Sequence, residues 1–218
     1  MRNKFDQEIA ELNAEVMKMS SFIEMTIAKA MQALKYNDHE LAKEVYENDH
    51  IADELEVSIE QKSLRILLSQ QPVARDLRTI SAALKMITDM ERICDQAADI
   101  GEIVLHFEDN AFSKNPQLLY HMAEQCVTMV TKAIDSFINS DYDLASAVIL
   151  SDDEIDRLFV EVRAGLIQEI VSDPQSGHLM VDFLMIAKYL ERIGDHAQNI
   201  AEWVIFSITG EHKNQRIL

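Results

Sequence analysis

Four pairs of carboxylates recur along this chain with the same spacing of four residues. The pairs are Asp49 with Asp53, Glu91 with Asp95, Asp152 with Asp156, and Glu191 with Asp195. At 3.6 residues per turn, this spacing puts both carboxylates of a pair on one face of a helix, one turn apart. Two like charges in this position destabilise a helix by a few tenths of a kcal/mol. The pairs therefore indicate either bound cations or the solvated faces of an acidic protein.

The pairs also fall in register across two expected helical hairpins. Residues equidistant from the turn of an antiparallel hairpin lie at the same level. Each expected hairpin has four carboxylates that obey this relation: around Pro72 they are Asp49, Asp53, Glu91 and Asp95, and around Asp173–Pro174 they are Asp152, Asp156, Glu191 and Asp195. Four carboxylates on one shared face cannot all stay ionised and unpaired. The same register in both halves favours a cation site over solvated faces.

The donors of these clusters are all carboxylate oxygens, which suit hard cations. Magnesium, manganese, calcium or iron is therefore expected rather than zinc or copper, and carboxylate bridges leave a multinuclear cluster open. A ferritin-like di-iron bundle would need Glu-x-x-His on two helices. Glu47 and His50 have that spacing, but the equivalent residues in the second half are Leu150 and Asp153. No histidine is predicted as a ligand.

Six helices are expected to position the carboxylates. The chain has only 5 Gly and 3 Pro among 218 residues, which argues against strands joined by tight turns. Asp38 is suited to cap a helix start, and Pro72 to break one helix and precede the next. Asn48–Asp49 is a candidate interruption. In the first half, apolar residues at three- and four-residue steps predict helices over about residues 5–36, 38–70 and 73–106.

The second half of the chain repeats the first. Residues 91–102 and 191–202 are identical at seven of twelve positions, and residues 37–42 resemble residues 140–145. The pattern predicts a tandem duplication of one three-helix unit, packed up-down-up because its connections are short. The polar stretch before Pro116 is the expected boundary, giving domains 1–110 and 111–218. The fold class is all-α, with two antiparallel three-helix bundles.

The formal charge of −18 restricts the partners of this protein. A polyanion repels nucleic acid and anionic lipid, so no nucleic-acid partner is expected. The charged N-terminus does not read as a signal peptide, and no apolar run is long enough for direct membrane insertion. Cys94 and Cys126 form no disulfide framework. A soluble cytoplasmic protein is expected.

A basic stripe occurs in the first half only. Arg75 and Arg78 open the third helix, whereas their counterparts are Gln175 and His178. Positive charge near a helix N-terminus opposes the macrodipole, so these residues do not stabilise their own helix. Two interpretations are left open: pairing with Asp76 or other nearby acids, and a docking patch for an acidic partner. In the second case charge reversal would weaken binding and leave stability almost unchanged.

The repeated Glu-Arg-Ile-x-Asp segments, the opening Phe5-Asp6-Gln7-Glu8 and Arg75-Asp76-Leu77-Arg78 together resemble the PhoU family of phosphate-specific transport accessory proteins. The resemblance covers essentially the whole chain and implies two three-helix bundles related by pseudo-symmetry. It implies a negative regulator of the phosphate-starvation response that works beside the ATPase subunit of the phosphate ABC importer and a membrane sensor histidine kinase. A homodimer is expected as well.

The same resemblance implies a role for the carboxylate pairs. The metal motif of the family, an acid followed four residues later by Asp, maps onto the eight residues of the four pairs, with iron, manganese or magnesium as candidate ions. Asp99 has Asn199 as its counterpart, an asymmetry by which the two sites could differ in affinity or nuclearity.

Three functional hypotheses remain open at this point. The first is a signalling adaptor with structural or sensory metal clusters, and it is the one that we expect. The second is a metal-dependent enzyme whose clusters activate water. It lacks support from any phosphate-binding loop, nucleophile elbow or Cys-x-x-Cys motif, and we expect no enzyme. The third is a purely structural helical dimer.

Overall fold

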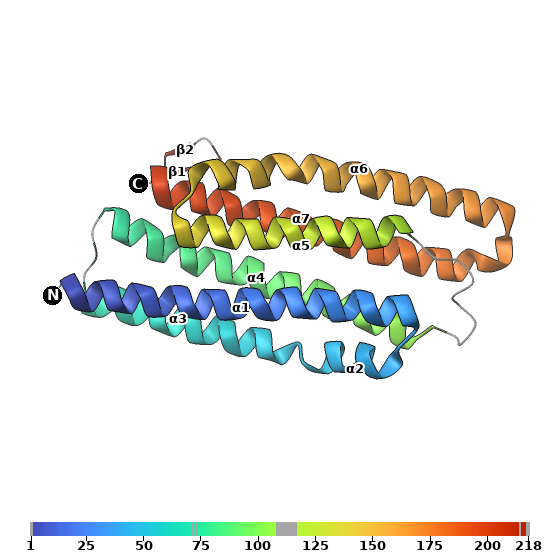
Figure 1. Cartoon of the computed structure of the whole chain (residues 1–218), viewed down its shortest axis with the longest axis horizontal. Helices are drawn as coiled ribbons and strands as arrows, with labels where there is room; N and C mark the ends of the chain where they lie inside the picture. The colour runs from blue at the N-terminus through green and yellow to red at the C-terminus, as the bar shows by residue number, and fades with distance from the viewer. Residues whose placement is uncertain (1, 71, 73, 108–116, 214, 217–218) are drawn as a thin grey trace.

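The computed structural model describes residues 2–70, 72, 74–107, 117–213 and 215–216, and these are helical almost throughout (Figure 1). The first half contains four helices: α1 (Arg2–Tyr36), α2 (His39–Glu47), α3 (His50–Gln70) and α4 (Arg75–Leu105). The second half contains α5 (Gln117–Asn139), α6 (Tyr142–Ser172), a 3-10 turn η2 (Pro174–Ser176) and α7 (Gly177–Thr209). The expected all-α class is confirmed, and α2 and α3 together form the second of the six expected helices.

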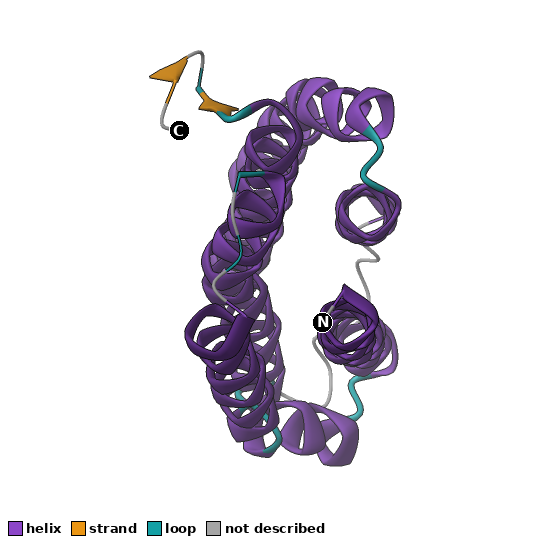
Figure 2. Ribbon diagram, turned by 90° about the vertical axis from the view of Figure 1, so that its left-hand side faces the viewer, coloured by secondary structure: helices purple, strands orange, loops and turns teal. Residues whose placement is uncertain are grey.

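The helices form two layers. α3, α4, α7 and α6 lie side by side in one layer, and α1 and α5 pack together on one of its faces (Figure 2). α4 and α7 run antiparallel and make the most extensive helix–helix contact, which joins the two halves. One continuous apolar core therefore extends through both halves. At one end of the joint, the rings of Phe107 and Phe183 meet edge to face at 5.9 Å.

The turn between the first two helices of each half has the same construction. Asn37 and Ser140 adopt positive φ angles of 51°. The next residue in each case, Asp38 or Asp141, accepts a hydrogen bond on its carboxylate from the amide of Leu41 or Leu144, at 3.0 and 2.9 Å. These bonds satisfy one of the free amides of a new helix, so both aspartates are N-caps as expected for Asp38.

The second expected helix is interrupted, as α2 and α3, whereas its counterpart in the second half, α6, is continuous. Asn48 ends α2, and its amide donates to the carbonyl of Glu44 at 3.1 Å before α3 begins at His50. The equivalent position on α6 is Ser151, whose hydroxyl donates to the carbonyl of Ala147 at 2.8 Å within an uninterrupted helix. Asn and Asp side chains compete for backbone hydrogen bonds and so disfavour helix interiors.

A short hairpin follows α7 that the sequence pattern did not predict. β1 (Glu211–His212) pairs antiparallel with β2 (Gln215–Arg216), and the imidazole of His212 stacks on the Trp203 ring at 3.9 Å. Gly210, with φ at 84°, ends α7 and reverses the chain. Strands of two residues are too short to give a period-two hydrophobic pattern.

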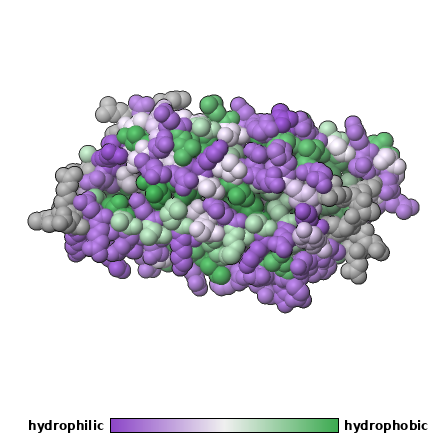
Figure 3. Space-filling model, in the orientation of Figure 1, coloured by the Kyte–Doolittle hydropathy of each residue, from purple (hydrophilic) through white to green (hydrophobic). Residues whose placement is uncertain are grey.

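The expected domain boundary at residues 110 and 111 lies outside the described residues. Within the described part of the chain, none of the helices combines the length and apolarity needed to cross a membrane. On the face formed by α1 and α5, apolar side chains gather along the middle, between hydrophilic upper and lower edges (Figure 3).

Candidate metal centres

The first carboxylate cluster lies between the start of α3 and the middle of α4. Asp49 sits in the break before α3, Asp53 in the first turn of α3, and Glu91 and Asp95 one turn apart on α4. The pKa of Asp49 is raised from 3.8 to about 6, first by burial and then by repulsion from Asp95 and Asp53. The antiparallel packing of α3 on α4 thus brings these carboxylates to one level.

Glu91 also has a raised pKa, and it contacts a neighbouring cation. Burial, followed by repulsion from Asp95, raises the pKa of Glu91 well above its ordinary range. Arg92 opposes that shift: its Nε lies 3.3 Å from Glu91 Oε2, and its Nη1 donates to Asp95 Oδ2 at 2.7 Å. One guanidinium thus bridges both α4 members of the cluster.

The second cluster lies between α6 and α7. Burial, followed by repulsion from Asp195 and Asp156, raises the pKa of Asp152 to about 6. The pKa of Asp195 is also raised, by burial and then by Glu191, while Lys188 acts in the opposite direction. Lys188 Nζ contacts both carboxylate oxygens of Glu191, at 2.6 and 2.5 Å.

The two halves thus bring together the same four positions. The structure places all eight predicted carboxylates in two clusters, one per repeat. Asp53, Asp156 and Asp195 are exposed, whereas the side chains of Glu91 and Glu191 are only 13% and 14% exposed. Each cluster therefore has one well-covered glutamate from the later helix and an open side where exposed aspartates meet solvent.

The donor chemistry of both clusters fits a hard cation, although the side chains are not arranged around one. Within the described residues, no three Asp, Glu, His or Cys side chains converge as ligands for a single ion. Asp49 Oδ1, however, is buried and has no hydrogen-bond partner among them, a costly state that a cation would relieve.

Two further carboxylates lie near the first cluster. Repulsion from Asp99 adds to the raised pKa of Asp49, and repulsion from Glu56 adds to that of Glu91. Asp99 was named from the sequence as an asymmetry between the two sites, whereas sequence reasoning missed Glu56. Cys94 is fully buried, and the same carboxylates together with burial raise the pKa of its thiol. Its counterpart, Gly194, carries no side chain.

A polar network at the α4–α7 joint links the two repeats close to both clusters. His196 Nδ1 lies 2.8 Å from Asp89 Oδ1, and the Asn199 amide donates to the same oxygen at 3.3 Å. The equivalent position to Asp89 is Tyr189, which is hydrogen-bonded to Asp99. The contact between α4 and α7 is therefore polar at both Asp89 and its counterpart Tyr189. His196 of the second repeat contacts Asp89 of the first.

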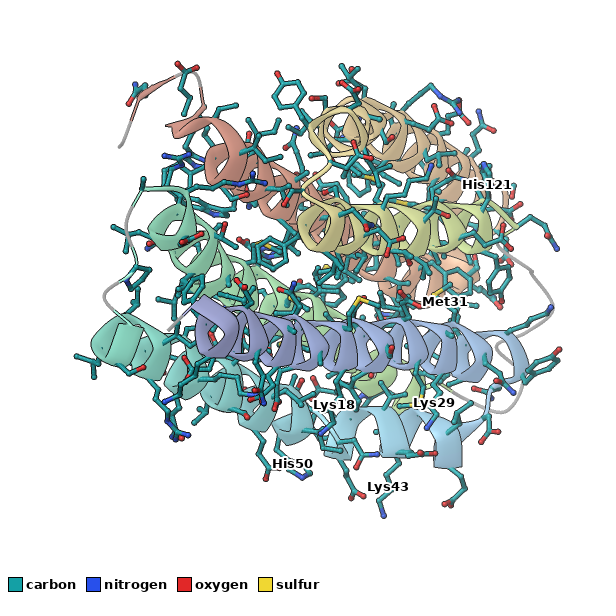
Figure 4. The ribbon with its side chains drawn as sticks, turned by 60° about the vertical axis from the view of Figure 1, so that its left-hand side comes forward. Lys18, Lys29, Met31, Lys43, His50 and His121 are labelled. Atoms are coloured by element: carbon teal, nitrogen blue, oxygen red, sulfur yellow. The ribbon has the colours of Figure 1, made fainter. Side chains whose placement is uncertain are left out.

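The remaining sequence candidates lie apart from the clusters. His50 points outward from the edge of the bundle, where its Nδ1 lies 2.9 Å from the carbonyl of Glu47 (Figure 4). Arg75 is exposed. Arg78 instead reaches across to α7, with its Nε and Nη2 each 3.4 Å from the carbonyls of Ser207 and Ile208. Arg78 thus meets the negative end of another helix, a contact that the sequence did not predict.

Comparison with known proteins identifies the family of this chain. Residues 16–104 and residues 119–204 each match the family model of the PhoU domain. The chain belongs to the PhoU family. A Clostridium acetobutylicum protein named phosphate-specific transport system accessory protein PhoU homolog is 32% identical over 96% of both chains. A Caulobacter vibrioides PhoU homolog of the same name is 34% identical over 95% of this chain and 90% of its own.

Solved PhoU structures have the same fold. The crystal structure of PhoU from Pseudomonas aeruginosa matches with a TM-score of 0.89 at 32% identity, over 95% of this chain and 100% of that one. The phosphate transport system regulatory protein PhoU from Streptococcus pneumoniae matches with a TM-score of 0.88 at 26% identity, over 95% of this chain and 98% of that one. The expected PhoU fold and family membership are confirmed.

Proposed function

We propose that this PhoU-family protein is a cytoplasmic accessory protein of phosphate uptake that represses the phosphate-starvation response. It acts as an adaptor between the ATPase subunit of the phosphate ABC importer and a membrane sensor histidine kinase. Hard metal ions in the two carboxylate clusters, with iron, manganese or magnesium as candidates, form part of this adaptor.

The observation that carries this proposal is the length of the match. Relatives named as phosphate-specific transport system accessory proteins align over 95–96% of this chain, and both repeats match the PhoU domain. A shared single helix or motif would support the fold alone, because folds host many functions. The names of these relatives describe accessory and regulatory proteins, which supports a role without catalysis.

The two clusters suit a structural or sensory role for the metal. In the first repeat Asp49, Asp53, Glu91 and Asp95 would hold the ion, and in the second Asp152, Asp156, Glu191 and Asp195 would hold it. A bound cation would supply positive charge that cancels the repulsion among these groups. Because each cluster draws on two helices, an ion would join α3 to α4 and α6 to α7, and so stabilise the helical faces that a partner contacts.

The docking surface is proposed at Arg75, on the exposed start of α4. Arg75 is available to an acidic partner, whereas Arg78 is engaged with the end of α7. A homodimer is part of the proposal, since two copies would present two such surfaces. Arg75→Glu therefore tests partner docking more cleanly than a change at Arg78.

The test is a deletion of the gene, with a phosphate-starvation reporter measured in phosphate-rich medium. Complementation uses the wild type, an Asp95→Asn/Asp195→Asn double variant, and a matched Glu40→Gln/Asp143→Asn double variant. Glu40 and Asp143 are exposed, equivalent residues outside the clusters, so the control also removes one carboxylate per repeat.

We expect the reporter to be active in the deletion strain and silenced by the wild type and the control. Continued activity with the Asp95→Asn/Asp195→Asn variant would make the metal clusters part of the signal. A reporter that stays silent in the deletion strain would contradict the regulatory function.

A further inference from the structure

Each carboxylate cluster is contacted by one cation from its own helix, but the two cations occupy different sequence positions. In the first repeat the cation is Arg92, next to Glu91; in the second it is Lys188, one turn before Glu191. The counterpart of Lys188 is Thr88, which donates to Glu56 at 2.9 Å. The duplicated helices therefore neutralise the same predicted ligand through unequal residues.

The counterpart of Arg92 makes the comparison sharper. Arg192 occupies the equivalent position on α7, yet within the described residues it makes no ion pair with Glu191 or Asp195. It influences Asp99 and Tyr189 across the joint instead. An arginine that follows the glutamate in sequence therefore does not always pair with it. In the second repeat, Lys188 pairs with Glu191 instead.

The contacts join half-exposed cations to carboxylates that are largely covered by the protein. The side chains of Arg92 and Lys188 are 55% and 46% exposed, whereas those of Glu91 and Glu191 are 13% and 14% exposed. The bonded oxygens belong to the predicted metal ligands Glu91, Asp95 and Glu191.

We propose that Arg92 and Lys188 are internal counter-cations of the ligand carboxylates, and that a metal ion must displace them in order to bind. This inference rests on the metal sites of the proposed function. Displacement frees a guanidinium and an ammonium group at the surface, so loading changes the charge that a partner meets.

The two sites should fill unequally. Arg92 bridges Glu91 and Asp95, so an ion entering the first site must break contacts to two ligands. Lys188 holds Glu191 alone, so an ion entering the second site breaks contacts to one. The second site therefore binds the ion more tightly and fills first.

The test is equilibrium binding of Mn²⁺ to the purified full chain, with free Mn²⁺ measured by its EPR signal. Arg92→Gln and Lys188→Gln are compared with Arg192→Gln, which removes one charge at an equivalent position without a bond to a predicted ligand. We expect Arg92→Gln and Lys188→Gln each to tighten binding at their own site by about fivefold or more, because charge-assisted hydrogen bonds no longer compete. Arg192→Gln should have a clearly smaller effect.

Two further variants assign the effect to contact and to site. Arg92→Lys keeps the charge but loses the planar fork, so its affinity should lie between those of the wild type and Arg92→Gln. In an Asp195→Asn background the Lys188→Gln effect should vanish, and in an Asp95→Asn background it should persist.

The outcomes separate this inference from the proposed function. Equal tightening by Arg192→Gln, or weaker or unchanged binding in Arg92→Gln and Lys188→Gln while the wild type binds Mn²⁺, would overturn the counter-cations and leave the metal sites standing. An absence of Mn²⁺ binding in every variant would overturn both. A first site that fills before the second would overturn the predicted order.

Discussion

Residues at equivalent positions of the two repeats make different contacts, and Arg92 and Arg192 illustrate this at the smallest scale. Arg92 bridges two carboxylates of its own helix, whereas Arg192 influences the other repeat. Arg78 and His178 differ in the same way: Arg78 binds the carbonyls of Ser207 and Ile208 at the end of α7, whereas His178 opposes the raised pKa of Asp182 on its own helix. The duplication gives both residues the same position on their helices, and the surrounding side chains determine which groups each residue contacts.

Charge reversal at Arg78 should destabilise the protein, unlike the same change at Arg75. Arg78→Glu replaces a cation at the carbonyl end of α7 with an anion, and we expect a loss of about 1 kcal/mol, or a melting temperature lower by roughly 2–4 °C. Arg75→Glu, on an exposed side chain in the first turn of the same helix, serves as the control and should melt at or slightly above the wild type, because a negative charge there favours the macrodipole. Thermal unfolding of both variants measures this, and equal melting temperatures would contradict a structural role for Arg78.

Ser140 is a strained residue that glycine should relieve. It adopts a φ of 51°, where a side chain normally costs about 1 kcal/mol that glycine does not pay. Ser140→Gly should therefore raise the free energy of unfolding by roughly 0.5–1 kcal/mol. Ser146→Gly, inside α6, should lower it because glycine disfavours helix interiors. Denaturant unfolding gives both values, and the same sign for the two changes would refute the explanation.

At the scale of elements, the spacing between helices depends on where glycine allows close approach. A Cβ on Gly101 of α4 would lie 3.0 Å from the carbonyl oxygen of Ala42 and 3.2 Å from Val45 Cγ1 on α2. A Cβ on Gly165 of α6 would meet nothing within 4 Å. The first glycine therefore lets α2 pack closely on α4, and the second has no such role.

Alanine at these two positions should have opposite effects. Gly101→Ala forces α2 away from α4 and should destabilise the protein by about 1 kcal/mol or more, because a backbone atom cannot move aside cheaply. Gly165→Ala should stabilise it by up to about 1 kcal/mol through helix propensity alone. Urea unfolding of the two variants checks this. Stabilisation by Gly101→Ala would show that α2 is free to shift.

At the scale of the whole molecule, the repulsion within the two clusters should make stability depend on pH. Asp49 and Asp152 have pKa values of about 6 in the folded protein against an ordinary 3.8, so the folded state binds protons more strongly than the unfolded state. Their contribution to stability is present below about pH 4 and is lost as pH rises through about 6. The metal-free protein, kept in chelator, should therefore melt a few degrees higher near pH 5 than near pH 7.5.

A matched variant and added metal isolate the clusters as the source. Asp49→Asn/Asp152→Asn should flatten the pH dependence, since amides do not titrate. Mg²⁺ should raise the melting temperature more near pH 7.5 than near pH 5, because the ion competes with protons for the same oxygens. An unchanged slope in the variant would assign the pH dependence to other carboxylates.

The helices, their repeat and the level at which the carboxylates meet could all be predicted from the order of the amino acids. These properties are local or follow from counting along a chain: periodicity marks each helix, Asp38 caps a start, and distance from Pro72 or Pro174 sets a register. The interruption at Asn48–Asp49 was indicated in the same way. The family was already indicated by the Glu-Arg-Ile-x-Asp segments, because they retain residue identities as well as a pattern.

The way in which the two repeats are joined, and the groups that surround the carboxylates, depend on the packing of helices that are distant in the sequence. The α4–α7 joint, the Asp89–His196 contact and the reach of Arg78 to α7 link residues more than a hundred positions apart. No period along the chain encodes such contacts, because they depend on which faces of two helices meet. The choice of Arg92 in one repeat and Lys188 in the other likewise depends on side-chain conformation, which the spacing of residues leaves open.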